Sequence, residues 1–488
     1  MSKGVTPQSK NYSSWYTEIV TKAELADYGP VKGTMVIRPY GYSLWELIKN
    51  SFDDMIKETG HVNAYFPLFI PKSFLAKEAE HVEGFAKECA IVTHTRLKSD
   101  SDVGLTIDPD SKLEEEVIVR PTSETVIWSM YKKWIQSYRD LPILINQWAN
   151  VVRWEMRTRL FLRTSEFLWQ EGHTAHETRE QAEKETLDIL ELYRKLAEDY
   201  LAMPVYTGFK TDSEKFAGAE KTYCIEAMMC DKKALQAGTS HNLGQNFAKA
   251  FDVKFQTKEN KEEFVWATSW GISTRLIGAV ILTHGDDRGL RIPPRIAPIQ
   301  IVFIPIFKNN NQKEKIKEFI SPIVESLRNI GVRMYEDWTE NSPGYKFNKW
   351  ELKGVPIRAE IGPKDIEKNS VVLVRRDTGE KLFVLIKDVI IKIESLISDI
   401  QISLFKQAKL FRDKNTYDVT KYVDLKKIIN DGGFVRCGWN GLKETEMKIK
   451  QETKATIRCI LLNQNIDELK CIYTGEPALF KVLIAKAY

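Results

Sequence analysis

The chain has 488 residues, of which 43% are hydrophobic and 28% charged, and its formal net charge of +4 permits an anionic partner without requiring one. This length is too great for a single domain and predicts two to four. No apolar run is long enough to span a bilayer, the first ten residues lack the apolar centre of a signal peptide, and the six cysteines are scattered, so a cytoplasmic protein is expected.

The first part of the chain is expected to combine helices and strands. Apolar residues at helical spacing and the polar composition of intervening stretches predict the boundaries. In chain order we expect a helix over 43–59, a strand and turn at 67–71, a surface loop from about 98 to 116, a helix over 177–201, strand-like pieces between 205 and 267, and an apolar helix within 270–282.

A stiff, proline-rich joint at 291–298 is the best domain boundary in the sequence. Beyond it, strands alternate with helices, which predicts a compact α/β domain. The expected strands are 299–307, 332–335, 357–361 and 371–375, and the expected helices are 313–330, 345–353 and 385–410. We therefore expect domains at 1–296, 297–400 and 401–488.

The segment 153–173 has the most informative pattern. With a period of two, one strand face would present Arg163, Ser165, Phe167, Trp169, Glu171 and His173, while Arg153 and Glu155 would share a face of the preceding strand. Such a mixture of arginines, carboxylates, an imidazole and aromatic rings suits a site for a triphosphate, a flat base and a small organic molecule. An exposed hairpin with basic residues at its tip is the alternative interpretation.

A nucleotide would have to be bound by side chains, because the chain has no glycine-rich phosphate loop. Arg153 and Arg275 offer guanidinium groups, which bind phosphate bidentately and stay charged. Glu155 offers a carboxylate that can accept a hydrogen bond from the amine of adenine.

Five segments carry a resemblance to a known family: 39–46, 120–125, 153–173, 238–247 and 270–275. With them the chain closely resembles prolyl-tRNA synthetases, which are class II aminoacyl-tRNA synthetases, in the archaeal/eukaryotic-like form without an inserted editing domain. The resemblance implies an α+β fold: a class II antiparallel sheet flanked by helices, then an α/β anticodon-binding domain and a small α+β C-terminal domain. It also implies a homodimer that joins proline to its tRNA through prolyl-adenylate, using ATP and magnesium, without editing in cis.

The same resemblance implies roles at the nucleotide end. Arg153, Arg163 and Arg275 would be catalytic through the charge that they neutralise on ATP. The ATP-binding residues would be Arg153, Glu155, Arg163, Thr164, Gln236, Thr239, Ser273 and Arg275, with Glu226 as the candidate for magnesium.

Free proline presents two N–H donors and a small apolar ring, so its site needs fixed acceptors and flat walls. The resemblance assigns the acceptors to Thr122, Glu124 and His173, and the walls to Trp169 and Phe216. The complete proline set is Thr122, Glu124, Arg153, Trp169, Glu171, His173, Phe216 and His241. Taken singly, Trp169 is more typical of a plain core residue and His173 of a core or surface residue, and only their shared register and the presence of Thr122 and Glu124 favour a site.

Candidate contacts for tRNA are Arg157, Arg159, Lys346, Arg358, Glu360, Arg375 and Arg376, although each one singly could be an ordinary surface charge. The family often holds zinc in its C-terminal domain. Here the partners of Cys437 and Cys471 fall on Leu442 and Thr474, so zinc is not expected. The rival interpretations are a tRNA-binding relative without catalysis and a class II synthetase for threonine or histidine.

Overall fold

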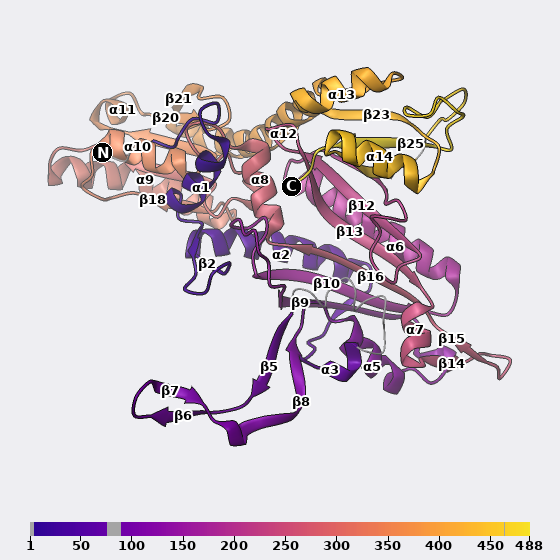
Figure 1. Ribbon diagram of the computed structural model, residues 1–488. Helices are drawn as coiled ribbons and strands as arrows, with labels where there is room; N and C mark the ends of the chain where they lie inside the picture. Colours follow the sequence, from indigo (N-terminus) through magenta and orange to yellow (C-terminus); the bar gives the residue numbers. More distant parts are fainter. Residues whose placement is uncertain (1–3, 76–88, 463) are drawn as a thin grey trace.

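A sheet of eleven strands forms the centre of the computed structural model, which describes residues 4–75, 89–462 and 464–488 (Figure 1). Residues 1–3, which belong to the ten-residue segment compared with a signal peptide, lie outside the described residues. In spatial order the strands are β22 (Thr416–Asp418), β23 (Phe434–Trp439), β25 (Phe480–Ala485), β24 (Thr456–Leu461), β11 (Val205–Phe209), β12 (Lys221–Met228), β13 (Ala234–Gly244), β16 (Trp266–Ser273), β10 (Glu166–His176), β9 (Ile143–Val152) and β3 (Val62–Asn63).

The sheet is antiparallel except where β3 pairs with β9 and β22 with β23. This confirms the expected antiparallel sheet of the α+β fold. One feature goes beyond that expectation, because the strands of the C-terminal segment join the same sheet through the β24–β11 pair.

Helices cover one face of the central part of this sheet. They are α1 (Tyr12–Lys22), α2 (Pro39–Glu58), α6 (Arg179–Lys195, continued by the π-helical turn η4, Leu196–Tyr200) and α8 (Arg275–His284). Phe52 on α2 stacks on Tyr193 of α6, with ring centroids 5.1 Å apart. Gly172 is needed here, because a Cβ atom would lie 2.1 Å from the ring of Trp270. The largest apolar cluster therefore lies on this face of the sheet.

The opposite face is covered at one end by α5 (Glu124–Trp134) and α7 (Asn246–Phe251). The remaining small elements of this region are β1 (Ala26–Tyr28), β2 (Met35–Ile37), η3 (Tyr138–Asp140), β14 (Lys254–Gln256) and β15 (Glu262–Phe264). The helix expected over 43–59 begins four residues earlier, since Pro39 fits the first helical position.

The prediction of a surface loop from about 98 to 116 is wrong. The structure has a hairpin, β6 (Leu97–Asp100) with β7 (Gly104–Ile107), which extends away from the body of the molecule in Figure 1. It is carried by β4 (Phe69–Pro71), β5 (Ala90–His94), η2 (Pro109–Ser111) and β8 (Lys112–Val119), with α3 (Lys72–Leu75) beside them. A hairpin exposed on both faces has no alternation of apolar residues, so its composition resembles that of a loop.

A separate five-stranded sheet follows the joint at η5 (Pro294–Ile296). Its order is β18 (Met334–Glu336), β17 (Ile301–Pro305), β19 (Ile357–Ile361), β20 (Ser370–Arg375) and β21 (Lys381–Leu385), with helices α9 (Asn310–Asn329), α10 (Pro343–Leu352), α11 (Pro363–Glu367), the turn η6 (Ile386–Asp388) and α12 (Val389–Lys414). The expected alternation of strands and helices is confirmed.

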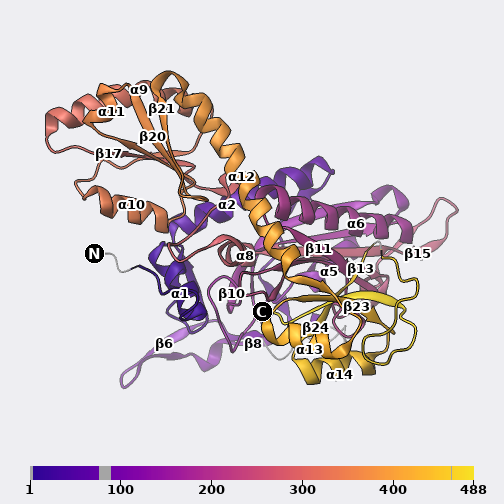
Figure 2. The same cartoon turned by 90° about the horizontal axis from the view of Figure 1, so that it is seen from above.

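Helix α12 connects this sheet with the C-terminal strands (Figure 2). Two more helices, α13 (Tyr422–Asp431) and α14 (Lys443–Thr453), pack on those strands. The side chain of Tyr488 is held against the loop between β12 and β13, because its hydroxyl donates a hydrogen bond to Asp231 at 2.8 Å. Within the described ranges, no helix is both long and apolar enough to cross a membrane.

Candidate active site

A cavity of about 320 Å³ lies on the polar face of the large sheet. Strand pairing builds its floor: Trp169, Glu171 and His173 on β10 lie opposite Ser273, Gly271 and Ser269 on β16. The structure brings together the following predicted residues as its lining: Thr122, Glu124, Arg153, Trp169, Glu171, His173, Phe216, Gln236, Thr239, His241, Ser273 and Arg275. Residues far apart in the sequence thus meet at one place.

Glu171 is the centre of a buried network beneath this cavity. Its Oε1 accepts hydrogen bonds from Ser123 Oγ at 2.5 Å and from Gln147 Nε2 at 2.7 Å, and its Oε2 lies 3.0 Å from His173 Nε2. Gln147 is fixed in turn, because its Oε1 accepts from the main-chain N–H of Phe66 at 2.5 Å. Three groups thus fix the direction of the Glu171 carboxylate.

Burial opposes the charged form of Glu171, but the hydrogen bond with His173, its positive charge and the donors Ser123 and Gln147 outweigh that cost, so the pKa of this carboxyl lies below its usual range. Burial also opposes charge on His173. The hydrogen bond with Glu171 and the negative charges of Glu124 and Glu171 nevertheless raise the pKa of the imidazole. The pair is thereby stabilised as carboxylate and imidazolium. An imidazolium donates from both ring nitrogens, so His173 does not fit the acceptor role that the resemblance assigns to it.

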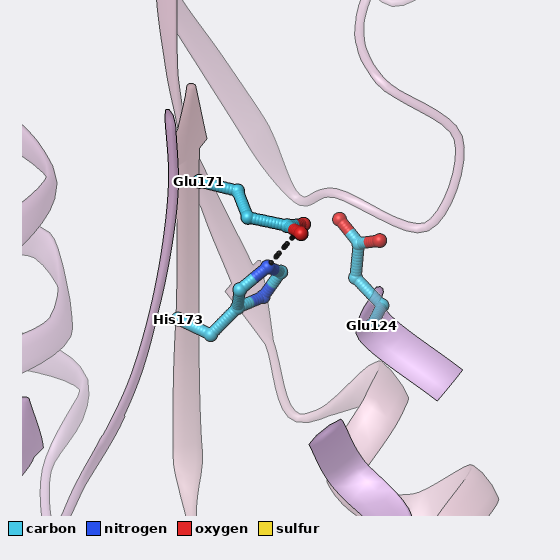
Figure 3. Close-up of side chains that lie close together, drawn as sticks. All are labelled: Glu124, Glu171 and His173. Atoms are coloured by element: carbon cyan, nitrogen blue, oxygen red, sulfur yellow. Dashed lines mark hydrogen bonds and ion pairs between the residues drawn. The ribbon is translucent and has the colours of Figure 1, made fainter. Parts of the chain in front are cut away.

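Figure 3 shows Glu124 facing Glu171 and His173, and all three residues line the cavity. Glu124 is at the start of α5, and its carboxylate accepts a hydrogen bond from the hydroxyl of Thr122. Among the described residues, Glu124, Glu171 and His173 form the one group whose atoms lie close enough to hold a metal ion. Because Glu171 already accepts from Ser123 and Gln147, the group is better suited to bind an N–H donor of an ammonium ion.

An aromatic pair closes the cavity on another side. Phe216 lies against His241, with ring centroids 4.6 Å apart. The hydroxyl of Thr222 lies 2.9 Å from His241 Nδ1. Burial, and then the charge of His173, lowers the pKa of His241 to about 3. His241 is therefore neutral at physiological pH and offers an uncharged wall.

A second cavity of about 350 Å³ adjoins the first and shares Arg153, Phe167, Ser273 and Arg275 with it. The other predicted residues in its lining are Glu155, Arg163 and Thr164. The alternation predicted that Arg153, Glu155 and Arg163 lie within strands. This prediction is wrong, because all three residues lie in the connection between β9 and β10.

Three arginines converge on this second cavity. Arg275 is the first residue of α8, and its Nε donates to the carbonyl oxygen of Leu162 at 3.2 Å. Burial, followed by the charges of Arg163 and Arg153, lowers the pKa of Arg275 to about 10. The side chain of Arg163 is about half exposed and reaches Glu155 at 3.6 Å. Mutual repulsion of neighbouring guanidinium groups is what an anion between them would relieve.

The structure contradicts the magnesium candidate Glu226. This residue is fully buried, and Lys210 Nζ binds its Oε1 at 2.6 Å. Arg458 from the C-terminal segment approaches the same carboxylate at 3.0 and 3.2 Å. Two cations occupy the position that a metal ion would need, so Glu226 does not fit a metal-binding role.

The tRNA candidates fall into different environments. The predicted tRNA contact at Lys346 is wrong. This side chain is buried and its Nζ donates to the carbonyl oxygen of Asp337 at 2.8 Å, so it cannot reach a base. Arg159 lies between the rings of Tyr16 and Tyr488, at 4.4 and 5.6 Å from their centroids. Arg157 is exposed.

The other anticodon candidates lie near a cavity of about 310 Å³ beside the five-stranded sheet. Arg358, Arg375 and Arg376 line it. Glu360 accepts from Arg358 Nε at 3.0 Å. Each arginine in the lining has an acidic partner, since Arg375 pairs with Asp377 and Arg376 with Asp286.

The C-terminal cysteines do not gather in one place. Cys437 and Cys471 lie near each other, beside the isolated β-bridge that pairs the main chains of Gly438 and Cys471. Cys459 forms a hydrogen bond with Cys224 instead.

Sequence reasoning missed several residues of the site. Ser123 stands within the segment 120–125 that carried the resemblance, but its role as a donor to Glu171 depends on a contact between α5 and β10. Gln147 pairs directly with Glu171 in the β9–β10 ladder, so a prediction of strand register would have found it. Lys210 and Glu214 line the cavity from a segment without a recognisable motif.

Three family models match separate parts of the chain. The tRNA synthetase class II core domain (G, H, P, S and T) matches residues 106–284, the anticodon binding domain matches 300–398, and the prolyl-tRNA synthetase C-terminal model matches 422–488. The chain thus contains all three parts in the expected order.

Curated relatives match the whole chain. The proline–tRNA ligase of Porphyromonas gingivalis is 57% identical over 488 residues, which cover 100% of this chain and 99% of that protein. The ligase of Bacteroides fragilis is 56% identical over 492 residues, with the same shares covered, and that of Christiangramia forsetii is 57% identical over 492 residues, with 100% of both chains covered. The chain belongs to the prolyl-tRNA synthetases, the class II proline–tRNA ligases.

Proposed function

We propose that this chain charges proline tRNA in two steps at the paired cavities. In the first step, a carboxylate oxygen of proline attacks the α-phosphorus of ATP, and pyrophosphate leaves. In the second, the terminal ribose hydroxyl of the tRNA attacks the carbonyl carbon of prolyl-adenylate, and AMP leaves. The observation that carries this proposal is the convergence of Arg153, Arg163 and Arg275 beside a small cavity with buried acceptors.

The second cavity is assigned to ATP. Arg153, shared by both cavities, would contact the α-phosphate and the proline carboxylate together. Arg163 and Arg275 would bind the outer phosphates, and Glu155 would accept from the adenine amine. Thr164, Gln236, Thr239 and Ser273 complete the proposed contacts. These groups act by positioning the reactants and neutralising charge, and no side chain acts as a nucleophile.

ATP enters as its magnesium complex, so the metal ion belongs to the substrate. Magnesium is commonly held by one or two carboxylates together with substrate phosphates. The carboxylate expected to supply that contact, Glu226, is already engaged by Lys210 and Arg458. The phosphates of ATP, rather than Glu226, would therefore hold the ion.

The first cavity is assigned to proline. The two N–H groups of the proline ammonium would donate to Glu124 and Thr122, with His173 held beside them by Glu171. Trp169, Phe216 and His241 would enclose the ring. An aromatic face near the ammonium group adds cation–π attraction. The small volume selects a small amino acid, and the fixed acceptors select a secondary ammonium.

We assign tRNA recognition to two places. Arg157, exposed in the β9–β10 connection, would approach the acceptor end together with Arg159. Arg358, Glu360, Arg375 and Arg376 would meet the anticodon, because base edges need both donors and acceptors and phosphates need cations. Lys346 is excluded from this set by its burial.

The proposal extends to the division into domains and to the oligomeric state. Each family match falls within one of the proposed domains 1–296, 297–400 and 401–488. We propose a cytoplasmic homodimer with contacts near α2 and the projecting hairpin, whose Leu97, Val103 and Leu105 are more than 60% exposed. Light scattering during size-exclusion chromatography tests this, and a monomer would contradict it.

We also propose that the chain does not edit mischarged tRNA in cis. The residues between His173 and Gly271 form α6, β11, β12, β13, α7, β14 and β15, which belong to the catalytic region itself. A pocket for proline cannot strongly reject alanine, since a missing methylene changes binding by about 1–3 kcal/mol. Alanyl-tRNA should therefore form slowly and persist, whereas its hydrolysis by the purified chain would contradict the proposal.

The two-step reaction is tested by separating its halves. Without tRNA, the wild-type chain should catalyse proline-dependent exchange of pyrophosphate into ATP. With proline tRNA, it should produce prolyl-tRNA and AMP. Charging that occurs without any exchange activity would contradict the adenylate intermediate.

A further inference from the structure

The segment that carries Phe216 is held in place by the C-terminal part of the molecule. This segment, residues 210–216, leaves strand β11 and passes along the edge of the first cavity. Lys210, Glu214 and Phe216 belong to the lining of that cavity. The conformation of the segment therefore determines the shape of one cavity wall.

Helix α14 makes the main contacts with this segment. Glu446 accepts a hydrogen bond from Thr211 Oγ1 at 2.7 Å through one carboxylate oxygen and from the hydroxyl of Ser213 through the other. Glu446 and Thr211 are both buried, with 6% and 3% of their surfaces exposed. One turn further along α14, Lys450 Nζ pairs with Glu214 Oε1 at 3.0 Å.

A third contact fixes the beginning of the segment. Lys210 Nζ donates to the carbonyl oxygen of Arg458, on strand β24, at 2.7 Å. The same Arg458 binds Glu226 through its guanidinium group. Two C-terminal elements, α14 and β24, thus hold residues 210, 211, 213 and 214 in succession.

The remaining contacts extend this order to the cavity wall. The main-chain N–H groups of Glu214 and Lys215 donate to the carbonyl oxygen of Thr211, which forms a compact turn. The N–H of Phe216 then donates to Thr222 Oγ1 at 3.0 Å. Because Phe216 follows this turn directly, displacement of Thr211 or Ser213 would displace its ring from His241.

We propose that Glu446 is a positioning residue for amino-acid specificity, acting through the segment 210–216 on the wall formed by Phe216. Glu446 does not touch the cavity, since it is absent from its lining. A carboxylate is suited to this role because it can accept from two hydroxyl groups at once, and hydrogen bonds to a charged acceptor are stronger than neutral ones. The proposal rests on the assignment of the first cavity to proline.

The effect should appear in the KM for proline. A wall that touches the ring contacts substrate and transition state alike, so its loss raises KM and leaves kcat unchanged. General loss of folded protein would instead lower the apparent kcat at constant KM. Alanine lacks the ring atoms that reach the wall, so its activation should be insensitive to the change.

The test is steady-state pyrophosphate exchange by the full chain with proline, alanine and ATP varied in turn. For Glu446→Gln, which cannot accept from both hydroxyls, we expect the KM for proline to rise about 10-fold. The kcat, the KM for ATP and the parameters for alanine should stay within about twofold of wild type. Glu444→Gln on the same helix is the matched control, because Glu444 is exposed and pairs with Lys448 instead.

A second variant removes the donors from the other side of the contact. Thr211→Val combined with Ser213→Ala should reproduce the rise in KM, and adding Glu446→Gln to it should cause little further change, because all three substitutions remove the same interaction. If Glu446→Gln lowers the Tm, the double variant Thr211→Val with Ser213→Ala decides whether the contact between Glu446 and the segment 210–216 sets the KM for proline.

The outcomes separate the two levels of the proposal. If the wild type shows no proline-dependent exchange, the proposed function fails. If the wild type is active but both sets of variants keep the wild-type KM for proline, or if alanine is affected as strongly as proline, the role of Glu446 is overturned while the function stands.

Discussion

The two ends of the active site are built differently. At the proline end, Glu171 and His173 are almost fully buried, and Glu171 is fixed by Ser123 and Gln147. At the ATP end, the side chain of Arg163 is half exposed and approaches Glu155 no closer than 3.6 Å. A small, rigid amino acid can be distinguished only by a cavity that is already formed. A triphosphate carries enough charge to order an exposed arginine such as Arg163 when it binds.

The largest loss of activity should come from the residue shared by the two ends. Arg153→Ala removes one preorganised charge from the transition state, which costs about 3–4 kcal/mol, so proline-dependent exchange should fall by about 10²- to 10³-fold. Arg328→Ala, an exposed position on α9, is the control. Exchange near the wild-type level in Arg153→Ala would show that the two cavities are not joined by this residue.

Disruption of the fixed end should affect one substrate only. Glu171→Gln replaces a buried carboxylate that accepts from three groups, and a lost hydrogen bond to a charged group is worth about 1.5–3 kcal/mol. We expect the KM for proline to rise about 10- to 100-fold while the KM for ATP changes little. Glu166→Gln, exposed at the start of the same strand, should resemble wild type. Equal increases in both KM values would remove the distinction between the two ends.

The ATP end can be disturbed separately through Tyr488. Its ring lies 5.6 Å from the guanidinium group of Arg159, in the connection that carries Arg163. Tyr488→Ala should loosen that connection and raise the KM for ATP about fivefold, in line with the loss of one cation–π contact. The KM for proline should stay constant, and Tyr417→Ala provides an exposed control. A change in the KM for proline alone would contradict this account.

The smallest predicted effect is a dependence of stability on pH. The pKa of His173 is raised, so its contribution is complete below about 6.5 and is lost as pH rises through the higher folded value. The pKa of Glu171 is lowered, so its contribution is present above about 4.5 and is lost as pH falls through the folded value. The difference in Tm between wild type and Glu171→Gln, about 2 °C near pH 6, should therefore narrow as pH rises further. Thermal unfolding followed by fluorescence measures it, and a difference that widens with pH would contradict the ion pair.

Strand alternation predicted that Phe167, Trp169, Glu171 and His173 share one face of β10, whereas Arg163 and Ser165 precede the strand. Most other residues of the two linings were named through the family resemblance, because alternation along one strand says nothing about segments distant in the sequence. Elements with strong periodicity were also predictable, as β19 and α12 show. The β6–β7 hairpin was not, since strands exposed on both faces have no apolar alternation. Glu226 was misassigned because its partner Arg458 is more than two hundred residues away, and only the joining of β24 to β11 brings them together.

The most direct test of the central claim, that a prebuilt cavity selects proline beside a charge-ordered ATP site, is pyrophosphate exchange by the wild-type chain with each of the twenty amino acids. Proline should give the highest kcat/KM, and alanine should follow with a kcat/KM lower by about 10- to 200-fold for each methylene missing from its side chain. Faster exchange with threonine or histidine than with proline, or no exchange with any amino acid, would contradict the account.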